Sequence, residues 1–120
     1  AKGIPYAYEG IAEPLRPTGF GAAVETLRRR VELAVFGRDD GFFNSAHLNL
    51  YRTGADHVSW HTDEDVALYG PTPVIASVSF GAERRFVLRA LADPAEGVAV
   101  DLTDGALLVM AGATQRHWEH

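Results

Sequence analysis

Residues 46–52 read AHLNLYR, and the periodicity of the chain changes at this stretch. Polar and apolar side chains alternate along it, and a period of two predicts a strand with one half-buried face. The β part of the fold is therefore expected to begin here. The alternating residues are His47, Leu48, Asn49, Leu50 and Tyr51.

The segment before this stretch has a helical period instead. Apolar residues recur every three or four positions over residues 18–36, which predicts one amphipathic helix. Thr18 is the expected N-cap residue, and Gly37 is the expected end of the helix. The apolar positions are Phe20, Val24, Leu27, Val31 and Ala34.

The segment after it predicts more strands, separated by turn residues. Asp104 and Gly105 form one such turn, which suits a tight hairpin. A helix followed by short strands predicts a mainly β fold with a packed helix, an α+β arrangement of the antiparallel sandwich or jelly-roll type. The further strands are expected over residues 73–80, 84–90, 97–102 and 105–111.

Composition limits the class of protein. The chain has 120 residues, of which 47% are hydrophobic and 22% charged, so we expect one globular domain over residues 1–120 that is truncated at both ends. It contains no cysteine, which excludes a thiolate nucleophile and a zinc–cysteine site. No stretch approaches the ~20 apolar residues of a membrane span. We therefore expect a soluble, cytoplasmic monomer with an acidic net charge of −5.

The most polar stretch of the chain, residues 51–65, reads YRTGADHVSWHTDED. Within it His61 and Asp63 lie two residues apart, and residues i and i+2 of an extended chain project from the same face. An imidazole and a carboxylate can then bind the same ion. Because such H-x-D triplets are common, the pair needs a third ligand before it predicts a metal site.

His117 is the third ligand that we predict. It follows the apolar strand expected over residues 105–111, and a partner strand of a rolled sheet would place it opposite the triplet. Two histidines and one carboxylate form the facial triad of non-haem Fe(II) oxygenases, which leaves positions open for a co-substrate and dioxygen. The sequence therefore predicts a metal site made by His61, Asp63 and His117, which suits an Fe(II) oxygenase and leaves zinc hydrolysis open.

The other histidines are not predicted to bind the metal. His57 and His61 would form an i,i+4 pair on a helix, but the residues around them favour extended chain. His47 is expected on a strand face. His120 stands at the end of the sequence and is expected to play no part in the site.

The motifs together resemble the AlkB-like Fe(II)- and 2-oxoglutarate-dependent dioxygenases, particularly the branch that repairs alkylated nucleobases. The resemblance runs through nearly the whole chain. Residues 3–10 resemble the aromatic substrate loop of that family, residues 49–54 its N-x-Y-x-x-G element, and residues 61–63 its metal triplet. Residues 43–44, 75–81, 105–110 and 117–118 resemble its sheet strands and its last metal ligand.

The resemblance implies a double-stranded β-helix, which is a relative of the jelly roll. It also implies that Fe(II) is bound by His61, Asp63 and His117. Asn49 and Tyr51 match positions that hydrogen-bond the co-substrate 2-oxoglutarate, and the alternation over residues 46–52 independently puts their side chains on one face.

The same resemblance implies a substrate. Tyr6 and Tyr8 match aromatic residues near the extruded base, and Asp65 matches an acidic residue of the base pocket. The expected activity is oxidative dealkylation of N-alkylated bases such as 1-methyladenine and 3-methylcytosine in DNA or RNA. Reaching such a base requires unstacking it, which costs least where alkylation has already broken the base pair.

One family element is not found in the sequence. The family continues beyond its last metal histidine with an R-x-N-x-T-x-R strand, whose arginines bind the far carboxylate of 2-oxoglutarate. Here the sequence ends three residues after His117, and Arg116, as its immediate neighbour on a strand, would point the other way. We therefore expect the natural protein to continue with an arginine-bearing strand.

Other functions stay open at this point. The domain could be a catalytically silent nucleic-acid-binding module. It could also be a related oxygenase acting on a protein or a small molecule, which the acidic net charge favours because nucleic-acid binders usually carry a basic field. A zinc hydrolase would need a carboxylate as general base, and Glu64 and Asp65 are the nearest candidates.

Overall fold

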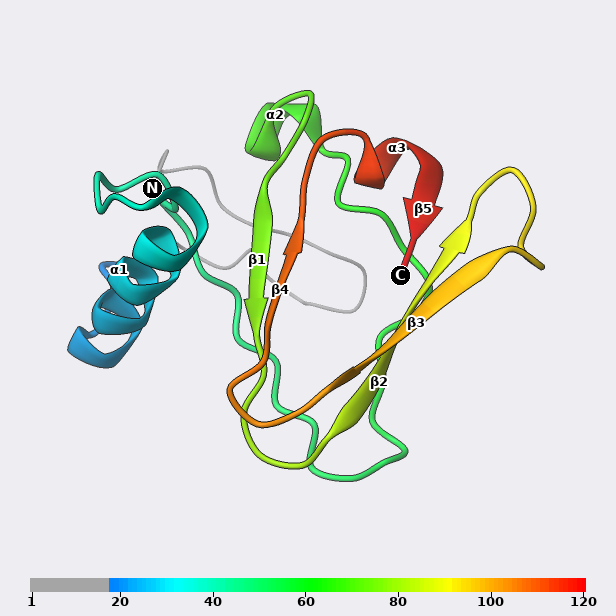
Figure 1. Ribbon diagram of the computed structural model, residues 1–120, viewed down its shortest axis with the longest axis horizontal. Helices are drawn as coiled ribbons and strands as arrows, with labels where there is room; N and C mark the ends of the chain where they lie inside the picture. The colour runs from blue at the N-terminus through cyan, green and yellow to red at the C-terminus, as the bar shows by residue number, and fades with distance from the viewer. Residues whose placement is uncertain (1–17) are drawn as a thin grey trace. The chain divides into compact units, whose positions relative to one another are not determined.

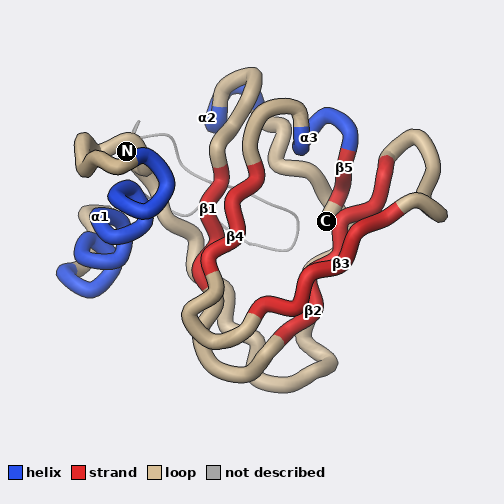
Figure 2. Tube along the Cα trace, viewed as in Figure 1, coloured by secondary structure: helices blue, strands red, loops and turns tan. Residues whose placement is uncertain are grey.

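The computed structural model describes residues 18–120, except for the side chains of Ala67 and Leu68. The chain forms two compact units, Ala1–Leu50 and Tyr51–His120. Figure 1 traces the elements of each unit along the chain, and Figure 2 colours the same trace by secondary structure. No helix formed by the described residues is long and apolar enough to cross a membrane.

The first unit contains the helix α1, Ala22–Phe36. The predicted N-cap at Thr18 is wrong, because Gly21 takes that position and its carbonyl accepts the Glu25 N–H at 2.9 Å. The predicted end at Gly37 is confirmed. Gly37 has φ 69°, a left-handed conformation that glycine adopts without a steric penalty, and its N–H donates to the Leu33 carbonyl.

Glu32 holds the loop after α1 in place. Its side chain has no exposed surface, which is rare for a carboxylate without paired donors. The side chain of Arg28 donates to it at 2.7 Å. The backbone N–H groups of Asp40, Gly41 and Phe43 also donate to it, at 3.1, 3.0 and 2.8 Å. One carboxylate thus satisfies four donors and ties the loop to the helix.

Three aromatic rings pack together where α1 ends and the following loop begins. The Phe36 ring lies 4.6 Å from that of Phe42 and 5.6 Å from that of Phe43, measured between centroids. Phe42 and Phe43 meet edge to face at 5.3 Å, a favourable geometry for aromatic pairs. The end of α1 and the following loop therefore form one aromatic cluster.

The acidity of Glu32 gives this unit a predictable pH dependence. Burial alone raises the pKa of Glu32, but hydrogen bonds from Arg28 and from the Phe43 and Gly41 N–H groups outweigh it, so the folded pKa lies below 4.5. The unfolded state therefore binds more protons than the folded state in this range. The stabilisation by Glu32 is complete above about pH 4.5 and is lost as the pH falls through the lower folded pKa.

We expect the melting temperature to fall more steeply below pH 4.5 in the parent protein than in Glu32→Gln, which has no charge to lose at this position. Circular dichroism melts across a pH series measure this difference. Parallel profiles for the two proteins would show that another group controls the acid transition.

The predicted strand over residues 46–52 is wrong. The segment is irregular, and no described strand pairs with it. Leu48 is 73% exposed and Leu50 is 83% exposed, so the apolar face expected to be buried is not. Alternation indicates a chain that can extend, but a strand also needs a partner backbone. Within residues 18–120 the structure provides none.

The second unit contains two antiparallel sheets. β1 (Ile75–Val78) pairs with β4 (Leu107–Met110), with Ile75 opposite Met110. In the other sheet β2 (Arg84–Ala90) lies between β3 (Gly97–Leu102) and β5 (Trp118–Glu119). Two short helices complete the unit, α2 (Val66–Tyr69) and α3 (Thr114–His117).

The predicted strands over 84–90 and 97–102 are confirmed, and those over 73–80 and 105–111 form with shorter bounds. The combination of helix and antiparallel strands is therefore as expected. The turn at Asp104-Gly105 also forms, with Gly105 at φ 75° and the Ala106 N–H donating to the Thr103 carbonyl. However, it makes no hairpin, since β3 and β4 belong to different sheets.

The two sheets are joined at one end, where β1 turns into β2 and β3 turns into β4 (Figure 1). Hydrogen bonds connect these two turns. Ser79 donates its N–H to the Ala106 carbonyl at 3.0 Å and accepts the Gly105 N–H at 2.8 Å. The Asp104 side chain accepts the Gly81 N–H at 2.8 Å. The chain thus passes from one sheet to the other twice at the same place.

Candidate metal centre

His61 and His120 face each other across a short backbone pairing. The His61 N–H donates to the His120 carbonyl at 3.2 Å, and the His120 N–H donates to the His61 carbonyl at 3.0 Å. This reciprocal pair of bonds is that of directly opposed residues in an antiparallel ladder, whose side chains project to the same side. The two imidazole centroids accordingly lie 4.4 Å apart.

Asp63 completes a group of three possible ligands. His61, Asp63 and His120 each offer one ligand atom, and these atoms lie within 4.8 Å of one another. The His120 Nε2 is 3.7 Å from the Asp63 Oδ2, which is too long for a hydrogen bond. The chemistry of the set, two imidazoles and one carboxylate, is that of a facial triad.

The His61 ring is oriented by a backbone carbonyl. Its Nδ1 lies 2.8 Å from the Ser59 carbonyl oxygen. Since a carbonyl can only accept, this hydrogen bond requires the proton on Nδ1. The Nε2 lone pair is then free for a metal ion, and hydrogen bonding through the second ring nitrogen is the usual arrangement for metal-bound histidines.

His120 is more enclosed than Asp63, since 9% of its side chain is exposed against 24% for Asp63. Its Nδ1 is buried and has no hydrogen-bond partner within the described part of the chain. Burial lowers the pKa of His120, and repulsion from His61 lowers it further, while Asp63 raises it. A lowered pKa favours the neutral imidazole, which is the form that binds metals. These observations fit a metal ligand.

The geometry gathers His120, in place of the predicted His117, with His61 and Asp63. His117 is the last residue of α3 and is exposed, and it does not belong to the group. We expected an extended chain here, but the chain stays helical through His117 and becomes extended only at Trp118. The residue that reaches His61 is therefore His120, which was not predicted to bind the metal.

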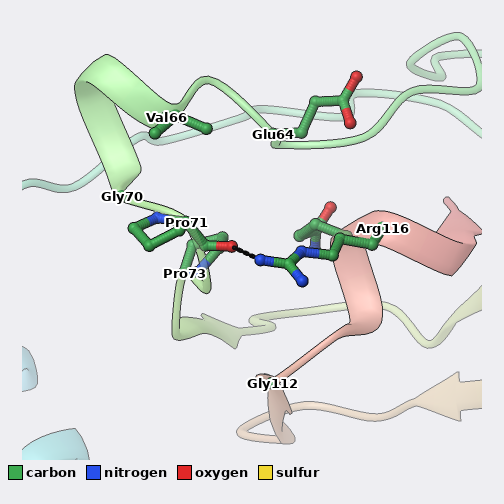
Figure 3. A pocket seen from close by; sticks show the side chains of 8 residues that line it. Glu64, Val66, Gly70, Pro71, Pro73, Gly112 and Arg116 are labelled. Atoms are coloured by element: carbon green, nitrogen blue, oxygen red, sulfur yellow. Dashed lines mark hydrogen bonds between the residues drawn. The ribbon is translucent and has the colours of Figure 1, made fainter.

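Asp63 is attached to α3 through a glutamine. Gln115 is 2% exposed, and its Oε1 accepts the Asp63 backbone N–H at 2.8 Å. Gln115 also lines a small cavity of about 130 Å³, shown in Figure 3. Across that cavity the Arg116 side chain reaches the Pro71 carbonyl at 3.2 Å. Gln115 was not among the predicted site residues, because nothing in its local sequence pattern separates it from a surface residue.

A second arginine supports the residues adjacent to both histidines. The Arg89 guanidinium carbon lies 3.9 Å from the Trp60 ring centroid, and its Nε donates to Glu119 at 2.6 Å. Trp60 precedes His61 and Glu119 precedes His120. The interactions of Arg89 thus connect the two segments that carry the imidazoles.

Tyr51, a predicted 2-oxoglutarate residue, stacks on an arginine. The Arg84 guanidinium carbon lies 4.3 Å from the Tyr51 ring centroid. Arg84 also donates to the carbonyls of Thr53 and Asp56, at 3.3 and 2.7 Å. This arginine therefore connects the loop that follows Tyr51 to β2.

Among the described residues, the structure does not bring the other predicted site residues together. Asn49 is exposed and belongs to the first unit, whereas Tyr51 belongs to the second. Asp65 is exposed at the start of α2, where its carbonyl accepts the Tyr69 N–H. Tyr6 and Tyr8 lie outside the described residues.

Comparison with known proteins identifies the family of the chain. The sequence profile of the 2OG-Fe(II) oxygenase superfamily matches residues 2–120. Alpha-ketoglutarate-dependent dioxygenase alkB homolog 3 of Homo sapiens is 39% identical over 126 residues, which cover 98% of this chain and 42% of the relative. The chain is also similar to DNA oxidative demethylase ALKBH2 of Homo sapiens, at 37% identity over 125 residues covering 98% of this chain and 45% of the relative.

DNA oxidative demethylase ALKBH2 of Arabidopsis thaliana is 43% identical over 100 residues, which cover 65% of this chain and 32% of the relative. The chain thus spans less than half the length of these relatives. The match nevertheless extends over almost all of the chain, including the H-x-D triplet and the segment that ends at His120. The chain belongs to the 2OG-Fe(II) oxygenase superfamily, whose name states the two requirements, Fe(II) and 2-oxoglutarate.

Proposed function

We propose that the protein removes alkyl groups from nucleobases of DNA or RNA by oxidation, with Fe(II), 2-oxoglutarate and dioxygen. The observation that carries this proposal is the convergence of His61, Asp63 and His120 in a chain of this superfamily. The names of the similar proteins, an alkB homolog and DNA oxidative demethylases, support the substrate class.

The metal ligands in this proposal are His61, Asp63 and His120, in place of the set with His117. When bound there, Fe(II) supplies the activation of dioxygen that oxidises the N-alkyl carbon, and the alkyl group then leaves as an aldehyde. The protein contributes the orientation of its ligands. The paired backbones hold His61 against His120, and the Ser59 carbonyl fixes the ring of His61.

The co-substrate and substrate residues stay as predicted from the resemblance. We propose that Asn49 and Tyr51 bind 2-oxoglutarate, and that Tyr6, Tyr8 and Asp65 contact the base. The stacking of Tyr51 on Arg84 supports a fixed position for the Tyr51 side chain. Monomeric state and cytoplasmic location remain predictions.

We also propose that residues 1–120 belong to one double-stranded β-helix. The double passage of the chain between the two antiparallel sheets, through the bonded turns at Ser79 and Gly105, supports this topology. The pairing of His61 with His120 supports it as well, since it extends the β3–β2–β5 sheet by one further segment.

Demethylation of a defined oligonucleotide tests the function. We expect the full-length protein, loaded with Fe(II) and 2-oxoglutarate, to convert 1-methyladenine or 3-methylcytosine to the unmodified base. Mass spectrometry of the oligonucleotide and release of succinate and formaldehyde measure the reaction. Asp63→Ala should reduce turnover below detection, because it removes the negatively charged ligand of the triad.

Thr62→Ala is the matched control, since this neighbour of Asp63 is not part of the ligand group. It should retain turnover. Succinate release that is stimulated by a protein or small molecule, with every methylated oligonucleotide unchanged, would reject the proposed substrate. Binding of oligonucleotide without Fe(II)-dependent turnover would indicate a catalytically silent module instead.

A further inference from the structure

Two polar side chains are buried among the residues that the structure describes. One is Gln115, and the other is Glu32 of the first unit. Gln115 lies in the middle of α3, whose neighbouring residues Arg116 and His117 are exposed. A buried amide must find partners for its oxygen and its nitrogen, because an unpaired polar group out of water is costly. Both the oxygen and the nitrogen of this amide have a partner.

The two partners determine the orientation of the amide group. Its Oε1 accepts the backbone N–H of Asp63 at 2.8 Å, a bond between residues 52 positions apart. Its Nε2 lies 3.6 Å from the sulfur of Met110, the last residue of β4, and a thioether is a weak acceptor. Since sulfur can only accept, Met110 favours the orientation in which the oxygen faces Asp63.

The attachment lies between a paired part and an exposed part of the ligand segment. His61 is fixed by two backbone bonds to His120, whereas the residues after Asp63, from Glu64 to Val66, are exposed. The bond to Gln115 holds the Asp63 backbone between these two regions. It therefore fixes the point from which the carboxylate extends toward the two imidazoles.

We propose that Gln115 is the positioning residue of Asp63 and sets the affinity of the centre for Fe(II). The inference rests on the proposed metal site. Gln115 acts through the backbone of a ligand and touches neither substrate nor cofactor. Partners of this kind commonly change metal affinity by ~10–100-fold when they are removed.

Anaerobic Fe(II) titration of the full-length protein and its variants tests the inference at a temperature well below unfolding. Gln115→Leu removes the acceptor at similar volume, and Gln115→Asn keeps an amide that is one methylene too short to reach. We expect both to weaken Fe(II) binding by ~10–100-fold. Gln115→Glu keeps an acceptor oxygen at the same distance and should restore most of the affinity.

Arg116→Gln is the matched control, because it changes the next residue of α3, which contacts the Pro71 carbonyl and not Asp63. It should bind Fe(II) as the parent does. Hydrogen exchange of the Asp63 amide in the metal-free protein gives a second readout, and it should be faster in Gln115→Asn than in Arg116→Gln.

The outcomes separate this inference from the proposed site. Equal Fe(II) affinity in Gln115→Asn, Gln115→Glu and the parent would overturn the positioning role, even if the melting temperature fell. If Gln115→Leu does not fold, the comparison of Gln115→Asn with Gln115→Glu still tests the positioning role. A parent protein that binds no Fe(II) would instead reject the metal site itself.

Discussion

Replacing His120 with alanine is expected to weaken Fe(II) binding by more than about a hundredfold and to abolish turnover. Loss of a residue that merely supports a ligand commonly costs ~10–100-fold, and loss of a ligand should cost more. His120 shares the group with His61 and Asp63, and its ring is largely enclosed. Anaerobic titration of Fe(II) into the full-length His120→Ala protein measures the effect.

His117→Ala is the control for this prediction, because it removes another histidine three residues away. Its side chain is exposed at the end of α3, so we expect Fe(II) affinity within about twofold of the parent. The reverse result, with affinity lost in His117→Ala and kept in His120→Ala, would restore the ligand set predicted from the sequence and contradict the geometry.

Replacing Glu32 with glutamine should strongly destabilise the first unit, lowering the melting temperature by roughly 10 °C, because it leaves part-buried backbone N–H donors without an acceptor. Glu32 accepts from Arg28 and from three backbone N–H groups. An amide has one acceptor oxygen, and its nitrogen would face donors. Thermal unfolding followed by circular dichroism measures the change.

Glu25→Gln is the matched control on the same helix. Glu25 also pairs with Arg28, at 2.7 Å, but 43% of its side chain is exposed and water can replace the lost contact. Its melting temperature should stay within about 2 °C of the parent, since exposed ion pairs contribute little. Equal melting temperatures for Glu32→Gln and Glu25→Gln would show that the buried carboxylate does not organise the loop.

Local sequence patterns correctly predicted those helices and strands whose formation depends mainly on neighbouring residues. The strands β2 and β3 have their predicted bounds, and α1 ends at the predicted glycine. The strand over residues 46–52 was wrong because alternation does not reveal whether a partner backbone is available. Glu32 was missed for a related reason. A charged residue in a helix is usually solvated, and only the fold shows that the following loop covers it.

In the candidate site, too, some residues could be predicted from the local sequence, whereas others depend on contacts made by the fold. His61 and Asp63 were found because two ligands at i and i+2 are visible in the sequence. The choice between His117 and His120 depends on where α3 ends and which residue pairs with His61, 59 positions away in the chain. No local signal carries that pairing. Gln115 was missed likewise, since its role depends on a contact with Asp63 across the fold.

We expect His61, Asp63 and His120 to bind one metal ion together. Anomalous diffraction from crystals of the full-length protein with Mn(II) and 2-oxoglutarate tests it most directly. We predict an anomalous peak next to the His61 Nε2, one Asp63 carboxylate oxygen and a His120 ring nitrogen, with His117 outside the coordination sphere. A peak bound by His117 in place of His120, or one that lacks Asp63, would contradict it.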